Sequence, residues 1–406
     1  MDTTPTGAAA LADEVTAAKE RIAIEARALH PRLIDISQDL HAHPELAFQE
    51  QRAAQVLTNE LEEHGFEVER GVAGMDTAFI ATYGSGEPVV AILAEYDALP
   101  KIGHACGHNL IAVWGVGGGI ALKRALPDTG GTIKVIGCPA EEGGGGKVIM
   151  ANAGIFNGLS AAMMMHPRDT TYIDRGSLAI VGFEVEFAGK SAHASSSPEQ
   201  GVNALDALLQ VFFSVAQLRQ QFPPQTRIHG IITHGGDAAN VIPDYTRAEF
   251  LVRANDQDYH EKLKQLFRDI CNAAALATGC TLTLTEGTGY KQRKSNPALI
   301  ERFRDNLLAM GLDYETPNAS TGVGSSDIGD VSQLVPTIHP YLQIADKGTP
   351  GHTLAFAEAS ASARADDLTA TGATLLAWTA ADVLLNPAVR ADLRSTFIEQ
   401  MGHDPA

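Results

Sequence analysis

Two short apolar runs in the first half of the chain limit the folds open to it. Residues 88–95 (PVVAILAE) and 132–138 (TIKVIGC) have the length of strands and are mostly apolar. Such runs are typical of strands that are buried on both faces of a sheet. Because helix-like segments such as residues 108–126 alternate with strand-like ones, the sequence predicts an α/β sheet domain covered by helices on both faces.

The pattern changes in the middle of the chain. Strand-like stretches of alternating polarity now enclose two helix-like ones, and in chain order the segments are 178–188, 203–221, 227–234, 247–254, 259–278 and 280–286. This order, βαββαβ, is that of a ferredoxin-like unit. We therefore expect an α/β domain made of residues 1–177 and 290–406, interrupted by an inserted α+β domain at residues 178–289.

Proline and apolar spacing set expectations for the two ends of the chain. Pro31 suits the first turn of a helix, so the N-terminal region is predicted to hold two helices, at about residues 9–29 and 31–42. A strand is expected at residues 336–344, and a long helical region from about residue 361 onwards.

Charge and cysteine content restrict the partners and the compartment. The formal net charge is −19, whereas nucleic acids and anionic membranes select basic surfaces, so we expect neither as a partner. The longest nearly uncharged apolar stretch, residues 110–122, is too short to cross a bilayer. The first residues show no signal peptide, and four cysteines do not make a disulfide framework. We therefore expect a cytoplasmic protein with reduced thiols.

The segment GHACGHNL, at residues 103–110, gathers side chains that ligate metals. Cys106 and His108 are two residues apart at the predicted start of a helix, which allows both to point into one cleft. Thiolate and imidazole suit zinc and its transition-metal neighbours. A metal site is therefore the leading interpretation of this segment.

Further candidate ligands follow predicted strands elsewhere in the chain. Glu141 and Glu142 come directly after the apolar run 132–138. Adjacent residues that leave a strand point in different directions, so one carboxylate can bind a metal while the other faces a water. His166 and His352 lie in two more segments of this kind, MMMHPRD and GTPGHTLAF. Open α/β sheets place their sites just beyond strand ends.

Such a ligand set would suit two divalent ions held by about five side chains. The ions would lower the pKa of a water between them and polarise a carbonyl group. Zinc is the default metal for histidine, cysteine and carboxylate ligands, with manganese or cobalt as alternatives. The sequence thus favours a hydrolase.

Two other functions stay open on the residues alone. Cys106 is a candidate nucleophile of a thiol hydrolase with a nearby histidine as its base, although so many carboxylates and histidines at strand ends weigh against it. A non-catalytic metal- or ligand-binding protein with the same fold is the second alternative. Two motifs are declined. His41 and His43 have metal-like spacing, but their segment resembles the structural helix end of the family named below, so no metal is expected there. GGGGK lacks the Ser/Thr of a phosphate loop because Val148 stands there.

The chain resembles the M20 family of metallopeptidases and amidohydrolases. It is most similar to the branch that holds aminobenzoyl-glutamate hydrolases, aminoacylase-1-like protein 2 and auxin-conjugate hydrolases. The resemblance runs from about Asp39 to His352 and is carried, in order, by DLHAHPELAFQE, EYDALP, GHACGHNL, CPAEEGGGGK, MMMHP, GKSAHAS, NVIPD, GSSDIGDVS and GTPGHT. It implies a catalytic α/β domain with an inserted lid, and a homodimer formed through that lid.

The resemblance also implies roles for residues of the catalytic domain. The ligands of a two-metal site would be Cys106, His108, Glu142, His166 and His352. Glu141 would be the general base, and Asp97 would be the aspartate that orients a ligand or bridges behind the residues that bind the metals. Many relatives outside this branch have a histidine ligand two residues before that aspartate, where this chain has Glu95. The CGH segment would then complete the metal shell.

Three residues of the inserted domain match positions that meet the substrate. His193 would stabilise the oxyanion, often across a dimer, and Asn240 and Arg253 would contact the substrate or its carboxylate. The expected reaction is hydrolysis of the amide bond in a small N-acyl amino acid, dipeptide or related conjugate. The lid loops and residues 318–327 are expected to set specificity.

Overall fold

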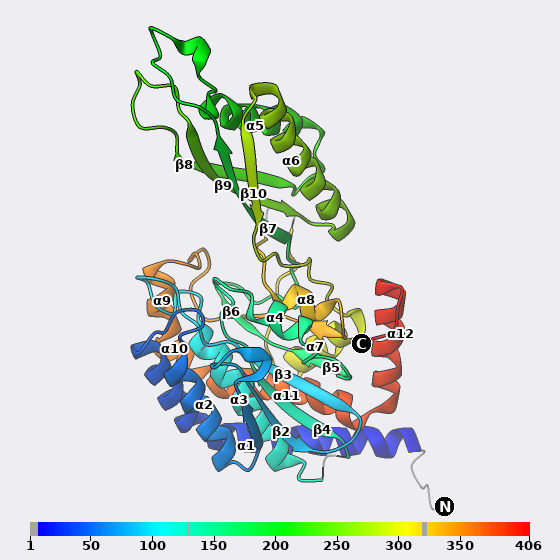
Figure 1. Cartoon of the computed structure of the whole chain (residues 1–406). Helices are drawn as coiled ribbons and strands as arrows, with labels where there is room; N and C mark the ends of the chain where they lie inside the picture. The colour runs from blue at the N-terminus through cyan, green and yellow to red at the C-terminus, as the bar shows by residue number, and fades with distance from the viewer. Residues whose placement is uncertain (1–6, 129, 319–322) are drawn as a thin grey trace, which may run out of the picture. The chain divides into compact units, whose positions relative to one another are not determined.

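The computed structural model describes residues 7–128, 130–318 and 323–406. The chain forms two compact units, Met1–Gly176 with Lys294–Gly322 and Asp330–Ala406, and Ser177–Arg293 with Val323–Gly329 (Figure 1). The expected domain boundaries put Val323–Gly329 in the catalytic domain. It groups instead with the second unit, where the Leu178 N–H donates to the Gly324 carbonyl at 2.8 Å. Residues 319–322 of the expected specificity segment lie outside the described residues.

A mixed sheet with the strand order β1-β2-β4-β3-β5-β11 forms the centre of the first unit. The bounds of its strands are β1 Glu67–Arg70, β2 Phe79–Gly84, β3 Val89–Ala94, β4 Thr132–Gly137, β5 Ala161–Met163 and β11 Thr337–Ile338. β3 pairs in parallel with β4 and β5, while β2 runs antiparallel to β4. The predicted α/β class is confirmed.

A second, parallel pair of strands includes the candidate ligand His166. It joins β6 (His166–Arg168) to β12 (Tyr341–Gln343). The strand expected at residues 336–344 is therefore two short strands, β11 and β12, which belong to different sheets. Pro340 stands between them, and a proline has no N–H to continue a ladder.

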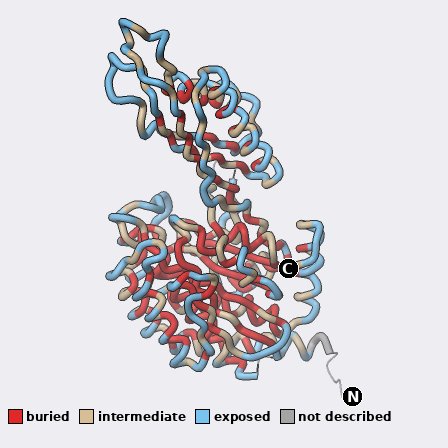
Figure 2. Tube along the Cα trace, in the orientation of Figure 1, coloured by how far each residue is buried: buried red, intermediate tan, exposed pale blue. Residues whose placement is uncertain are grey.

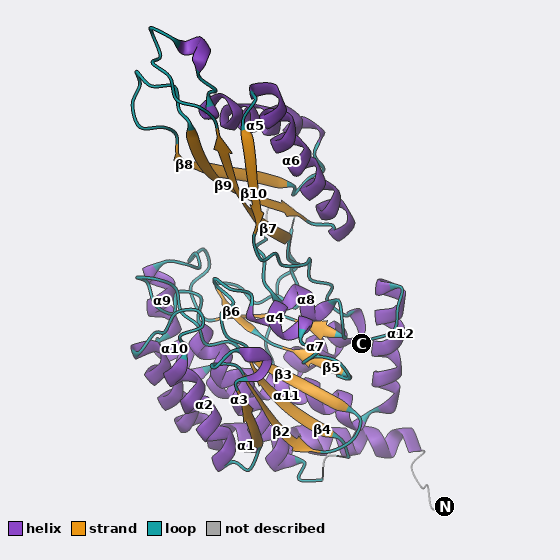
Figure 3. Ribbon diagram, in the orientation of Figure 1, coloured by secondary structure: helices purple, strands orange, loops and turns teal. Residues whose placement is uncertain are grey.

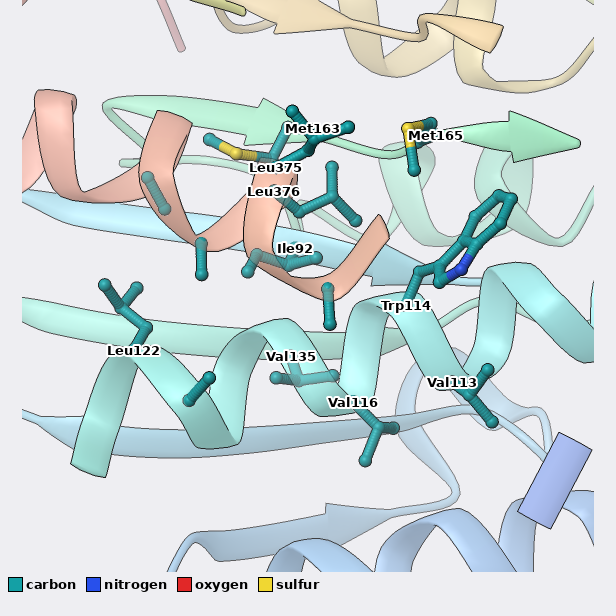
Figure 4. Close-up of a cluster of buried hydrophobic side chains, with 14 of the residues drawn as sticks. Ile92, Val113, Trp114, Val116, Leu122, Val135, Met163, Met165, Leu375 and Leu376 are labelled. Atoms are coloured by element: carbon teal, nitrogen blue, oxygen red, sulfur yellow. The ribbon is translucent and has the colours of Figure 1, made fainter. Parts of the chain in front are cut away.

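Three helices build the core against this sheet. α3 (His108–Ala125) and α11 (Thr369–Leu385) pack on β3, and α1 (Gly7–Ala42) packs against both helices. Figure 4 shows Trp114 of α3 and Leu376 of α11 among the buried side chains around Ile92 of β3. Buried residues are concentrated in these elements (Figure 2). His108 is thereby fixed at the first position of a helix that is buried along most of its length.

The predicted break at Pro31 is wrong, because α1 runs through it. The apolar side chains Leu29, Leu33, Ile36 and Leu40 continue at helical spacing across the proline, and each is at most 4% exposed. Burial of this stripe outweighs the backbone hydrogen bond that proline cannot donate.

The other helices of the first unit are shorter. Their bounds are α2 Gln51–Glu63, α4 Gly146–Asn152, α7 Pro297–Ala309, α8 Ile328–Ser332, α9 Leu354–Ser360, α10 Ala363–Asp367 and α12 Pro387–Met401. The stretch Ala363–Leu385 is long and apolar enough to cross a membrane by length and composition, although most of it is buried inside the protein, as in a core helix. This stretch falls in the long helical region expected from about residue 361, and Asp366, Asp367 and Asp382 interrupt its apolar residues.

The second unit has the predicted βαββαβ order. Its elements are β7 Ala179–Ala188, α5 Ala204–Leu218, β8 Arg227–His234, β9 Tyr245–Ala254, α6 Gln257–Thr278 and β10 Thr281–Glu286. The antiparallel sheet has the order β10-β7-β9-β8, and α5 and α6 lie against it (Figure 3). Phe183, Phe250 and Phe267 form the centre of its own hydrophobic core. The inserted α+β fold is confirmed.

Candidate metal centre

The turn that carries Cys106 and His108 depends on a glycine. Gly107 has a φ of 78°, and a Cβ atom on it would lie 2.4 Å from Cγ of Pro167. Only glycine adopts this left-handed conformation without strain and also leaves room for Pro167. The turn therefore lies directly against β6, which begins with His166.

Asp97 fixes the ring of His108. The Nδ1 atom of His108 is 2.9 Å from Oδ1 of Asp97, and both side chains are fully buried. Because the carboxylate accepts this hydrogen bond, Nδ1 carries a proton, and Nε2 is the nitrogen that offers its lone pair once the ring is neutral. A carboxylate–histidine pair of this kind is typical of histidines that ligate metals.

In His166, as in His108, Nε2 is the nitrogen available to a metal. Its Nδ1 atom is 2.7 Å from the carbonyl oxygen of Pro167, which can only accept. Nε2 therefore keeps its lone pair, and it lies 3.4 Å from Sγ of Cys106.

His352 reaches the same place from a loop near the C-terminus. Its N–H donates to the Ala105 carbonyl at 2.9 Å, which ties the GTPGHT loop to the GHACGHNL turn. Its φ is 60°, an uncommon value for a residue with a side chain. The Nε2 atom of His352 lies 3.4 Å from Oε1 of Glu142. This contact places His352 beside Glu142.

The loop after β4 presents Glu141 and Glu142. The N–H of Glu142 donates to Oδ2 of Asp97 at 2.9 Å, so the aspartate that orients His108 also holds this loop. Glu141, Glu142 and His108 can bring one ligand atom each to within 4.8 Å of one another. The predicted base and a predicted ligand thus lie together.

The five predicted ligands form two groups with one shared member. In each group the ligand atoms lie within 4.8 Å of one another, and the groups are Cys106, His108 and His166, and Cys106, Glu142 and His352. A sulfur common to both groups suits two neighbouring ions. Nε2 of His108 and Oε1 of Glu142 are buried without a hydrogen bond to any of the described residues. Bound cations would satisfy both atoms, so the residues fit a dinuclear metal centre.

Burial and charge perturb the titration of these groups in the absence of a metal. Burial, together with the charge of Glu142, raises the pKa of the Cys106 thiol. Burial lowers the pKa of His166 well below its usual range, so this ring is neutral at pH 7. Burial would also lower the pKa of His108, but the charge and hydrogen bond of Asp97 outweigh it and raise that pKa well above normal. The perturbations mark a functional site.

Glu95 has a partner that was not predicted from the sequence. Both Glu95 and Lys147 are buried, and the Lys147 ammonium donates to Oε1 of Glu95. The other carboxylate oxygen of Glu95 lies 3.5 Å from Nε2 of His108. The lysine of GGGGK therefore neutralises a buried carboxylate beside the site. The sequence does indicate that Glu95 has a partner. A glutamate at the end of an apolar strand is expected to be buried, and a buried carboxylate needs a cation beside it.

The declined histidines make backbone contacts. His41 Nε2 is 2.8 Å from the Ala357 carbonyl oxygen, and His43 Nδ1 is 2.9 Å from that of Asp39. Neither residue takes part in the two ligand groups.

In the second unit, His193 and Asn240 lie together. The Ala194 N–H donates to the Asn240 carbonyl at 3.0 Å, and His193 bridges to Val241. The backbone N–H groups of Ser195 and Ser196 both donate to Nδ1 of His193, at 3.3 Å. Nδ1 is thus the acceptor, and in the neutral ring Nε2 carries the proton as a free donor.

Arg253 lies apart from this pair, near the other end of β9. With a rise of about 3.4 Å per residue, roughly 27 Å of strand separates it from Tyr245, which follows Asn240 in the chain. Its guanidinium donates weakly, at 3.5 Å, to the Ser325 hydroxyl. The structure therefore groups His193 with Asn240, but not with Arg253.

Comparisons with known proteins agree with this geometry. Residues 175–279 match the model of the peptidase dimerisation domain of the M20 family. The chain is 36% identical to the Xaa-Arg dipeptidase of Mus musculus, over 95% of this chain and 93% of that protein. The chain belongs to the M20 family. This M20 protein is also 35% identical to one of the p-aminobenzoyl-glutamate hydrolase chains of Escherichia coli, over 62% of this chain and 56% of the relative.

Solved M20 structures show the same fold. The dinuclear metal-binding M20 peptidase YXEP of Bacillus subtilis has a TM-score of 0.69 at 24% identity, covering 88% of this chain and 99% of that one. The M20 protein described here is a metal-dependent amidohydrolase or peptidase. The comparisons give no support to a cysteine-nucleophile hydrolase or to a non-catalytic relative.

Proposed function

We propose that this M20 enzyme hydrolyses the amide bond of small N-acyl amino acids or dipeptides at a two-metal centre. The observation that carries the proposal is the convergence of five ligand side chains in two groups that share Cys106, with Glu141 beside them. When bound, two divalent ions would lower the pKa of a water and polarise the scissile carbonyl. Zinc is the proposed metal, because the donors are a thiolate, three imidazoles and a carboxylate.

Glu141 is the proposed general base. Its carboxylate lies within 4.8 Å of ligand atoms of His108 and Glu142, within reach of a water held there. In this role Glu141 accepts a proton from the attacking water and then delivers it to the nitrogen of the leaving amine. Asp97 keeps His108 in the tautomer that leaves Nε2 available.

His193 is the proposed oxyanion donor of the lid, in cis or across a dimer. Its Nε2–H is free to donate because two backbone N–H groups occupy Nδ1. Asn240, which lies beside it, and Arg253 are proposed to bind the substrate or its carboxylate.

The names of the relatives support this substrate class. They include an Xaa-Arg dipeptidase, an aminobenzoyl-glutamate hydrolase, an N-acetylcysteine deacetylase and an indole-acetic-acid–amino acid hydrolase. The substrates in these names share one feature, an amide on the nitrogen of an amino acid. We propose the same feature in the substrate of this enzyme.

The decisive experiment is Glu141→Ala with metal analysis. The purified enzyme is screened by mass spectrometry against N-acyl amino acids and dipeptides, and its metals are quantified in the same preparation. We expect Glu141→Ala to abolish turnover of the best substrate while its metal content stays near wild type. Retained turnover would remove Glu141 as the base.

A homodimer through the second unit is also proposed. β8 is an edge strand of its sheet, and it exposes Ile231 by 63% and Ile232 by 41%. Phe213 on α5 is 65% exposed. Apolar side chains on an unpaired edge strand favour pairing with another chain. Ile231→Lys is expected to give a monomer by light scattering, whereas Leu276→Lys on α6 serves as the control with an exposed apolar residue elsewhere.

A further inference from the structure

Glu50 is a buried carboxylate outside the proposed ligand set. Its side chain is inaccessible to solvent. Oε1 accepts hydrogen bonds from the N–H groups of Phe48 at 3.0 Å and Ala140 at 2.9 Å. Oε2 accepts from the Thr77 hydroxyl at 2.9 Å. Glu50 thus connects the segment before α2 to the loop after β4.

Ala140 is the residue directly before Glu141. Its φ is 61°, although it is not a glycine. The left-handed conformation costs a residue with a side chain about 1–2 kcal/mol, so the surroundings must hold it there. The Ala140 carbonyl accepts from Gly144 at 3.1 Å and from Gly145 at 2.8 Å, which closes the loop that carries Glu141.

Two buried carboxylates therefore hold the backbone on either side of Glu141. Glu50 binds the N–H of Ala140 before it, and Asp97 binds the N–H of Glu142 after it. Asp97 also orients the ring of His108. Glu50, by contrast, binds two backbone amides and one hydroxyl, and it orients no ligand side chain.

Burial of this carboxylate is costly. Desolvation raises the pKa of Glu50 despite the hydrogen bonds that it accepts. Glu45, in the same segment, accepts from the N–H groups of Arg52 and Ala53 at the start of α2 from a half-buried position. Helix capping in this segment therefore does not require a fully buried acid.

We propose that Glu50 is a positioning residue for Glu141. By fixing the Ala140 amide, it sets the direction in which the Glu141 side chain leaves the loop. The inference rests on the proposed function, in which Glu141 is the general base. It assigns Glu50 no contact with substrate or metal.

The test compares Glu50→Ala, Glu50→Gln and Glu45→Ala. Glu50→Ala is expected to lower kcat on the order of 100-fold, with KM changed less than about threefold and metal content at the wild-type level. Glu50→Gln keeps an oxygen that accepts from both amides, so it is expected to retain kcat within about fivefold. Glu45→Ala loses helix capping and thermal stability, but its kcat is expected to match wild type.

Three results would overturn the proposal. One is an unchanged kcat in Glu50→Ala, another is a loss of kcat that merely follows a loss of metal, and the third is an equal loss of kcat in Glu45→Ala. If Glu50→Ala does not fold, Thr77→Val provides the test, because it removes the hydroxyl that orients Oε2. We expect faster hydrogen exchange at Ala140 and a lower kcat in Thr77→Val, and wild-type values of both would contradict the proposal.

A parallel Glu141→Ala variant separates the positioning role from the proposed function. If Glu141→Ala keeps its turnover, the assignment of Glu141 as the base fails, whatever Glu50 does. If Glu141→Ala is inactive while Glu50→Ala is fully active, only the positioning role fails. Adding Glu50→Ala to Glu141→Ala is expected to cause no further loss of activity.

Discussion

Asp97 holds His108 and Glu142 with opposite oxygens of one carboxylate. Oδ1 accepts from Nδ1 of His108 and Oδ2 accepts from the N–H of Glu142, each at 2.9 Å. The relationship links a proposed ligand at the start of α3 to a proposed ligand in the loop after β4. The relative position of these two residues therefore depends on Asp97, which contacts both.

Asp97→Asn is expected to weaken metal binding by about 10- to 100-fold. An amide has one accepting oxygen, so it cannot accept from both His108 and the Glu142 N–H as Asp97 does. Chelator competition on the purified variant measures the affinity. Asp382→Asn is the control. Asp382 is a buried aspartate that is not part of the metal centre, and its carboxylate lies 2.7 Å from the ammonium of Lys19. Equal affinities for Asp97→Asn and wild type would contradict the account.

Metal binding is expected to release protons and to tighten as pH rises. The pKa values of Cys106 and His108 are both raised in the metal-free site, so both groups hold a proton at pH 7. Each must lose its proton to ligate a metal, so acid competes with the metal. Affinity should increase about tenfold per pH unit for each proton released. Calorimetry in buffers of different ionisation enthalpy counts these protons, and a value of zero at pH 7 would be inconsistent with a buried, protonated thiol.

Gly107→Ala is expected to cost about 1–3 kcal/mol more stability than Gly74→Ala. Both glycines have a positive φ, 78° and 74°, so both substitutions strain the backbone. A Cβ at Gly107 would also meet Pro167, whereas one at Gly74 has no atom of the described neighbours within 4 Å. Chemical denaturation of the two demetallated variants measures the difference. Equal stabilities would mean that the turn does not lie tightly against β6.

The sequence predicts the parts of this fold that short-range patterns encode. The alternating strands and two amphipathic helices of the second unit lie within a few residues of the expected bounds. The candidate ligands lie in short motifs near strand ends or at the start of a helix, so these motifs can be identified from the sequence alone. The continuous helix through Pro31 was not predicted, because it depends on a core that other elements provide.

Sequence patterns did not predict the residues that hold the site in place. Glu50 and the strained backbone of Ala140 that it holds are 90 residues apart in the chain. Lys147 and Glu95 come from different elements, and the motifs that contain them, CPAEEGGGGK and EYDALP, do not show that the two residues pair. Such pairs are formed by packing in three dimensions. A buried charge in an apolar strand shows that a partner exists, but not where it is in the chain.

The central claim is that bound divalent metal makes amide hydrolysis possible here. Its most direct test is the turnover of the best N-acyl amino acid or dipeptide before chelation, after complete demetallation, and after titration with zinc, manganese or cobalt. The account predicts that activity disappears with the metal and returns as about two ions bind to each chain. Undiminished turnover by the fully demetallated enzyme, together with inactivation by thiol alkylation, would contradict it and would favour Cys106 as a nucleophile.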